Sequence, residues 1–215
     1  MKTLSPEVLL MVSLGIGMVP ILISVGTCYL KFSIVLSLLR SGFGTQQAPS
    51  ASMVMALSMV MSLVVMQPVV QGTMERMKEI KVSELAGASV ATILKHADTA
   101  TIPWRDFITK HTGDRERDTF ARFTVSDSEG AGTPKLGMAH ELAAFVLSEI
   151  KKGFLIGFIL LIPFFVIDVI VANVLVALGL TMMSPSTVSL PLKLLLFVSS
   201  DGWLLLVKSL IVAYQ

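Results

Sequence analysis

Charged and amide side chains inside long apolar runs are the residues of this sequence best placed to do chemistry. Asp168 and Asn173 lie within the apolar run 154–180. A carboxylate inside a bilayer costs several kcal/mol unless it is paired, protonated or in contact with water. Asp168 is therefore either a buried polar anchor between subunits or part of an ion or proton relay. A lone acidic residue makes a weak relay, which favours the anchor.

Three further charges, Lys193, Asp201 and Lys208, lie in the apolar run 192–213. At about 100° per residue they fall within one sector of a continuous helix. Such a helix does not show all its faces to lipid. We therefore expect it to pack against other chains or to line an aqueous path.

Two adjacent methionines, Met182 and Met183, lie in the connection 181–191 between these two runs. Adjacent methionines at a helix end usually serve packing. Thioether side chains are also flexible and apolar. If several copies of the chain converged on an axis, Met182 and Met183 could form a constriction that seals a pore and yields to a passing chain.

Motifs for enzymatic or metal chemistry are missing from the sequence. Asp168 and Asp201 lack the glycine-flanked aspartate motif of an intramembrane protease, since Asp201 stands in Ser-Ser-Asp-Gly-Trp. The three histidines are 15 and 29 residues apart and form no H-E-x-x-H pattern, and no phosphate-binding glycine loop occurs. We therefore expect no enzymatic activity, no cofactor and no metal.

The composition is that of a membrane protein. Of the 215 residues, 53% are hydrophobic and 15% are charged, and the mean hydropathy is +0.78. Soluble domains carry about 25% charged residues. These values exclude a disordered chain, a nucleic-acid-binding domain and an ordinary cytosolic enzyme. Residues 71–152 hold 12 of the 17 Lys and Arg and 12 of the 15 Asp and Glu, so the chain is apolar, then polar, then apolar.

This layout predicts an all-α membrane protein with four hydrophobic helices in two hairpins around a polar, mostly helical insert. We expect the first hairpin at 1–70, the insert at 71–152 and the second hairpin at 153–215. A run of 20 apolar residues, such as 51–70, reaches across a bilayer core of about 30 Å. The remaining expectations are apolar helices at 4–30, 154–180 and 192–213, connections at 31–50 and 181–191, insert helices at 73–97 and 138–152, and an insert loop at 112–135.

The charge distribution gives two answers about the side of the membrane on which the insert lies. The connection 31–50 carries two basic residues and no acidic residue, which favours the cytoplasm and puts the insert on the opposite side. Basic residues at both ends of the insert, Arg76 and Lys151 among them, favour the reverse.

Several motifs in order along the chain resemble those of one family. They are TCYLKFSIVLSLLR at 27–40, GTQQAP at 44–49, IPFFVID at 162–168, SLPLKLLLF at 189–197 and DGW at 201–203. Together they closely resemble the SctR/FliP family, the R subunit of the type III secretion export gate, over most of residues 20–70 and 138–215. The GTQQ motif resembles that of the injectisome branch. The sequence also starts without the longer extension usual in flagellar members, which favours the same branch.

The resemblance implies a non-enzymatic core subunit of the export gate. Copies of the chain, forming a pentamer, would assemble with the S and T subunits into a ring-like, pseudo-helical complex. That complex would be the pore for unfolded secreted proteins at the bacterial inner membrane, projecting to the periplasmic side together with the insert. The implied partners also include the inner rod and needle adaptor proteins, the U and V export-apparatus subunits and membrane lipid, but no nucleic acid.

The resemblance also implies roles for single residues. The methionine gasket of the family falls on Met182 and Met183, with Thr181 where the family often has a third methionine. Five residues would pair between helices or subunits, namely Asp168, Asn173, Lys193, Asp201 and Lys208. Three others, Arg40, Gln46 and Gln47, would lie at the tip of the first hairpin, at the cytoplasmic mouth of the pore. Two other functions stay open, a small-ion or proton carrier that uses Asp168 and a pure assembly scaffold.

Overall fold

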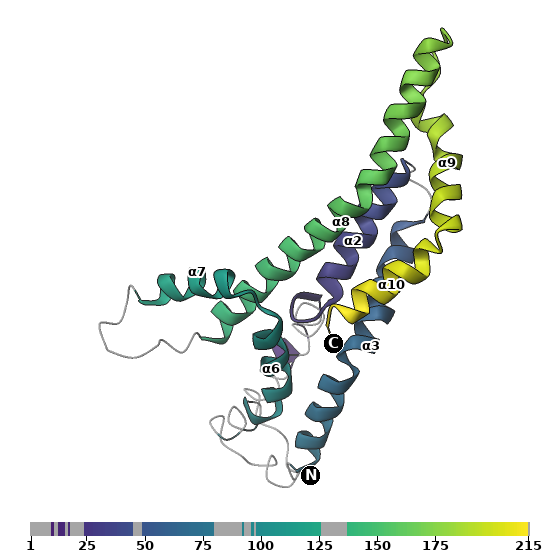
Figure 1. Cartoon of the computed structure of the whole chain (residues 1–215). Helices are drawn as coiled ribbons and strands as arrows, with labels where there is room; N and C mark the ends of the chain where they lie inside the picture. The colour runs from purple at the N-terminus through teal and green to yellow at the C-terminus, as the bar shows by residue number, and fades with distance from the viewer. Residues whose placement is uncertain are drawn as a thin grey trace. The chain divides into compact units, whose positions relative to one another are not determined.

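The computed structural model describes residues 10, 13–15, 17, 24–44, 49–79, 92, 96, 98–125 and 137–214, and these contain helices and no strand. The all-α prediction is therefore confirmed for the described part of the chain. The helices, shown in Figure 1, are α2 (Tyr29–Phe43), α3 (Ala51–Glu79), α6 (Ile102–His111), α7 (Asp114–Val125), α8 (Met138–Ala177), α9 (Pro185–Ser199) and α10 (Gly202–Val212).

The chain divides into two compact units, each built from two stretches of sequence. The first unit combines Met1–Cys28 with Val64–Ser148, and the second combines Tyr29–Leu63 with Glu149–Gln215. The second unit holds α2, α9, α10 and most of α8, and therefore all the described candidate site residues.

Glycines let α2 and α8 pack closely in the second unit. Gly153 and Gly157, one turn apart on α8, lie against Ile34 and Leu38 of α2. Gly42 near the end of α2 lies in turn against side chains of α8. Small residues four apart permit this close approach of two backbones in apolar surroundings.

This packing predicts different costs for the same substitution at two neighbouring glycines. A methyl group at Gly157 would collide with Leu38 as far back as its Cβ, 3.1 Å away, whereas the nearest atoms at Gly153 lie at 3.3 Å. We expect Gly157→Ala to lower the free energy of unfolding by about 1 kcal/mol, because overpacking outweighs the gain in helix propensity. Gly153→Ala is the matched control, with an effect near zero. Equal effects in denaturant titrations would contradict this account.

Residues 31–50 do not form the polar connection expected from the sequence. Tyr29–Phe43 is α2, and its residues Phe32, Val35, Leu36 and Leu39 are buried at helical spacing. Charged residues in an otherwise apolar stretch favoured a polar connection here, but Lys31, one of its two basic residues, is itself buried. The turn is therefore shorter than predicted, and Arg40 lies inside the helix.

A Schellman motif ends α8 and creates a tight turn. Gly179 has φ +76°, and the Leu180 N–H donates to the Leu175 carbonyl across 2.9 Å. This left-handed conformation is what a helix C-terminus closed by glycine requires. The next helix begins at Pro185, a favoured first helical residue, so α9 takes up part of the predicted connection 181–191.

The apolar run 192–213 is broken into two helices. α9 and α10 are bent by 61° at a break where Asp201 adopts φ 52°. Gly202 follows with no room for a side chain, because an added Cβ would meet the Phe197 ring. The single helix with one charged sector was therefore a wrong prediction, since the three charges do not share an axis.

The first unit contains the described part of the insert up to Ser148. The indole N–H of Trp104 on α6 donates to the Gly26 carbonyl at 2.7 Å, and the Gly113 N–H donates to Ser148 Oγ at 3.1 Å. The predicted loop 112–135 is wrong in its first part, which forms α7, and residues 126–136 lie outside the described residues. The expected helix 138–152 is confirmed and runs without a break to Ala177.

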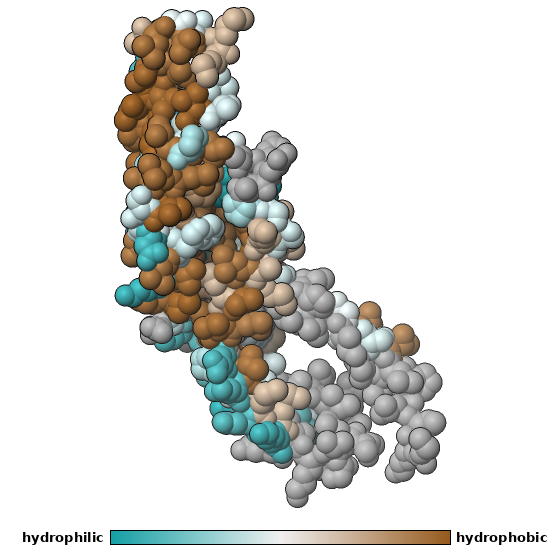
Figure 2. Space-filling model, turned by 90° about the vertical axis from the view of Figure 1, so that its right-hand side faces the viewer, coloured by the Kyte–Doolittle hydropathy of each residue, from teal (hydrophilic) through white to brown (hydrophobic). Residues whose placement is uncertain are grey.

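Two described helices are long and apolar enough to cross a membrane, namely Ala51–Lys78 of α3 and α8. The bent pair α9 and α10 would be a third span if it crosses as one element. Figure 2 shows one face of α9 and of the C-terminal end of α8, and hydrophobic side chains cover most of it. Most of the expected first apolar helix, 4–30, lies outside the described residues.

Candidate functional site

A buried lysine joins three helices of the second unit, namely α2, α8 and α9. Lys193 on α9 is 1% exposed, and its Nζ lies 2.6 Å from Asp168 Oδ2 on α8. The same Nζ donates to the Gly42 carbonyl, at the C-terminal end of α2, across 2.9 Å. A cation is favoured at a helix C-terminus because the last carbonyls there lack partners within the helix.

The other oxygen of Asp168 is also satisfied from α9. The Ser189 hydroxyl donates to Asp168 Oδ1 at 2.5 Å. Ser189 precedes Lys193 by four residues, so both side chains lie on one face of α9. The side chain of Asp168 is 37% exposed, while that of Lys193 is 2% exposed. The pair is therefore open to its surroundings on the carboxylate side.

A second buried cluster lies near the start of α2, and the sequence reasoning missed it. Lys31 Nζ lies 3.3 Å from Glu149 Oε2, and the two side chains are 3% and 0% exposed. The hydroxyl of Tyr214 donates a hydrogen bond to the same carboxylate. The Lys31 ammonium also lies 3.8 Å from the centre of the Tyr214 ring, a cation–π contact. The available signal was a lysine and a glutamate next to apolar runs, each of which needs a partner.

The two ion pairs hold opposite ends of α2. Lys31 lies in its first turn, and the Gly42 carbonyl lies in its last. Both carboxylates, Glu149 and Asp168, belong to α8. In this arrangement each charge is neutralised inside one chain, which is what an anchor between helices needs.

The methionine pair lies in the turn between α8 and α9. Met182 is 101% exposed and Met183 is 49% exposed. A large apolar side chain that makes no packing contact with its own chain is available to another surface. This exposure is compatible with a role in an assembly and does not favour internal packing.

Comparison with known proteins gives the family. The profile of the FliP family matches residues 10–210. This chain belongs to the FliP family. The chain is 36% identical to the hypersensitivity response secretion protein HrcR of Ralstonia nicotianae over 210 residues, 96% of each chain. It is also 36% identical to the surface presentation of antigens protein SpaP of Shigella flexneri over 203 residues, 92% of this chain and 91% of that one. Identity to the Yop proteins translocation protein R of Yersinia pestis is 34% over 218 residues, 100% of this chain and 99% of that one.

Membership of the FliP family confirms the resemblance drawn from the sequence motifs. Two of these motifs contribute the ion pair, since 162–168 ends in Asp168 and 189–197 holds Ser189 and Lys193. The residues of the ion pair, and the serine that bonds to it, therefore belong to the motifs that carry the family resemblance.

The other sequence candidates are not brought together in the single chain. Asn173, Asp201 and Lys208 are exposed, and within the described residues none of them forms a hydrogen bond or ion pair with Asp168 or Lys193. Arg40 lies on α2, while Gln46 and Gln47 fall outside the described residues. Pairing of the exposed residues with another subunit stays a prediction. Within the described residues, no group of three His, Cys, Asp or Glu side chains could hold a metal ion.

Proposed function

We propose that this FliP-family chain is the R subunit of a type III secretion export gate of the injectisome type, acting at the bacterial inner membrane. Its support is the family match over residues 10–210. Relatives that align over nearly their whole length carry names of secretion and translocation proteins. The long apolar helices agree with a membrane location.

In this proposal the chain forms a ring-like complex with further copies of itself and with the S and T subunits, and unfolded proteins pass through its centre. Large apolar side chains on α8 support the need for such partners. Phe158 and Phe165 are 66% and 68% exposed in the single chain. Exposed apolar surface of this extent marks contact with lipid or with other proteins. The arrangement of four hydrophobic helices in two hairpins belongs to the same proposal.

The Asp168–Lys193 pair acts here as an anchor and not as an ion carrier. The ammonium and both carboxylate oxygens are already bonded to groups of α2, α8 and α9. A relay needs a group that exchanges its proton with a path, whereas this pair joins the C-terminal end of α2 to α8 and α9.

Shortening Met182 and Met183, in the turn between α8 and α9, should let small ions leak through the pore. If Met182 and Met183 seal the pore, the double variant Met182→Ala/Met183→Ala should assemble normally and raise small-ion conductance severalfold, because alanine leaves the constriction open. The measurement is ion flux across membranes that contain the assembled complex. The exposed Leu178→Ala change in the same turn is the control. An unchanged leak in the double variant would remove the gasket from the proposal.

Native mass spectrometry in mild detergent tests the proposed function itself. The chain is purified alone and after co-expression with the S and T proteins of its own system. A discrete homo-oligomer that binds S and T is the expected result. A stable monomer that binds neither protein would overturn the gate assignment.

A further inference from the structure

A single file of buried residues attaches α10 to the second unit. The file takes every fourth residue, from the start of the helix to just past its end, namely Gly202, Leu206, Leu210 and Tyr214. The residues between them are half-buried or exposed. A helix on a protein surface usually buries a stripe at least 100° wide, with three or four residues in every two turns. The attachment of α10 therefore depends on few side chains.

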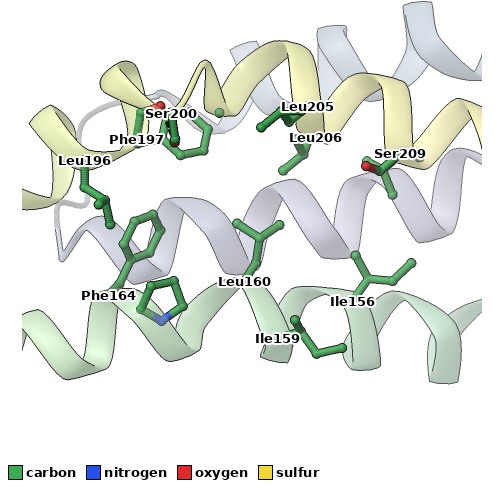
Figure 3. Close-up of a pocket in the computed structure, with 13 residues that line it drawn as sticks. Ile156, Ile159, Leu160, Phe164, Leu196, Phe197, Ser200, Leu205, Leu206 and Ser209 are labelled. Atoms are coloured by element: carbon green, nitrogen blue, oxygen red, sulfur yellow. Dashed lines mark hydrogen bonds between the residues drawn. The ribbon is translucent and has the colours of Figure 1, made fainter.

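Packing between the middle of α10 and α8 is incomplete. A pocket of about 370 Å³ lies between these helices and α9, and Leu160 of α8 and Leu206 of α10 point into it from opposite sides (Figure 3). It extends along α8 from Ile156 to Phe164. Side chains that line a space of this size lose part of the contact that close packing would give them. The contacts at the two ends of α10 therefore matter more for its position.

The N-terminal end of α10 has the form of a hinge. Only Ser200 and Asp201 connect it to α9, and the two helices are bent by 61° at this point. Asp201 has φ 52°, and the next turn is held by an edge-to-face contact of the Phe197 and Trp203 rings, whose centres are 5.1 Å apart. A few residues at the end of an element, in an uncommon backbone conformation, are typical of hinge positions.

The C-terminal end of α10 is held by the side chain of Tyr214. Its hydroxyl donates a hydrogen bond to Glu149 of α8, and the Lys31 ammonium of α2 lies 3.8 Å from the centre of its ring. The ring also meets Phe32 of α2 edge to face, with the ring centres 5.7 Å apart. A hydrogen bond to an ionised group is roughly twice as strong as one between neutral groups. One side chain therefore ties the end of α10 to both α2 and α8.

We propose that α10 is a hinged helix with a closed and an open position, and that the contact of Tyr214 with Lys31 and Glu149 holds it closed. When Tyr214 leaves this pair, α10 turns about Ser200 and Asp201 away from α8. The movement keeps the hydrogen bonds within α10 and separates its file of buried side chains from α8. This switch belongs to the single chain and goes beyond the proposed role in the export gate.

The test measures the distance between α8 and α10 by pulsed electron spin resonance, on the full chain in mild detergent. Spin labels are attached to cysteines introduced by Leu155→Cys on α8 and Val212→Cys on α10, two positions with exposed side chains. Cys28, the one cysteine of the sequence, is buried and is replaced by alanine in every variant. With Tyr214 intact we expect one narrow distribution of distances.

Tyr214→Ala should add a second population with a longer distance. A turn of about 20° moves the far end of this 11-residue helix, about 16 Å long, by about 6 Å. The ratio of open to closed chains should rise about tenfold or more, because the hydrogen bond to the carboxylate and the cation–π contact are both lost. Tyr214→Phe keeps the ring on Lys31 and Phe32 and loses only the hydroxyl. We therefore expect a smaller rise, of about threefold.

A second pair of labels separates movement of α10 from loosening of the whole unit. Leu195→Cys on α9 replaces the label on α10, while the label at Leu155 is retained, and both side chains are exposed. The bond from Lys193 to Asp168 holds α9 on α8 independently of Tyr214. The distance from α8 to α9 should therefore stay unchanged in Tyr214→Ala.

Two results would overturn the proposal. One is an unchanged distance from α8 to α10 in Tyr214→Ala, and the other is an equal broadening of the α8–α9 distance, which would make Tyr214 a general stabiliser of the unit. If Tyr214→Ala does not fold, urea titration of the labelled chains with Tyr214 intact decides. The longer α8–α10 distance should then appear at a lower urea concentration than any change between α8 and α9, and simultaneous changes would refute the hinge.

Discussion

Asp168→Asn should lower the free energy of unfolding by about 3 kcal/mol, a larger loss than removal of its partner lysine. The variant leaves the Lys193 ammonium, 2% exposed, without a countercharge. An uncompensated buried charge costs about 3–5 kcal/mol, and the lower end applies because the asparagine oxygen still accepts a hydrogen bond. Lys193→Met leaves a carboxylate that is 37% exposed and still bonded to Ser189, so about 1–2 kcal/mol is expected.

Denaturant titration in detergent, followed by far-ultraviolet circular dichroism, measures both losses. The double variant Asp168→Asn/Lys193→Met is the control, because it removes the unpaired charge and should recover much of the loss of Asp168→Asn. An ion carrier predicts another result. Asp168→Asn would then abolish transport at unchanged stability, and Lys193→Met would not compensate. That outcome would return Asp168 to the role of relay.

The sequence was sufficient where a local signal and the tertiary structure agree. The helix 138–152 was expected to continue into the apolar run because only Gly153 interrupts it, and α8 is continuous. Gly153 serves as a contact surface for α2, which a sequence pattern cannot distinguish from a helix break. The family was within reach because its motifs are specific combinations of residues in a fixed order.

The sequence was insufficient where a partner distant in the chain decides the outcome. Lys31 looked like a residue of a polar connection, yet Glu149, 118 positions away, makes its burial possible. The break at Asp201 had a local signal in Asp-Gly, a turn dipeptide. That signal was outweighed by the apolar residues on both sides. The sequence shows charges, while their pairing depends on packing that only the structure provides.

Lys31→Met should be among the most destabilising single substitutions in the second unit, at about 3–5 kcal/mol. It leaves the Glu149 carboxylate, 0% exposed, with the Tyr214 hydroxyl as its hydrogen-bond donor and Lys152 at 3.8 Å. Desolvation of a carboxylate is compensated only by a close countercharge and full hydrogen bonding. Since Glu149 Oε1 already has no hydrogen-bond partner in the described part of the chain, little remains to offset the loss of Lys31.

The paired substitution separates charge from shape. Lys31→Met/Glu149→Leu replaces both ions by apolar groups and should return to within about 1 kcal/mol of the wild-type chain, since a buried ion pair is often matched by apolar packing. Lys152→Met is the control, because its half-exposed ammonium should contribute about 0–1 kcal/mol. The same denaturant titration measures all of them. If the double variant is as unstable as Lys31→Met, the lysine stem and its contact with Tyr214 stabilise α2, and the ion pair does not.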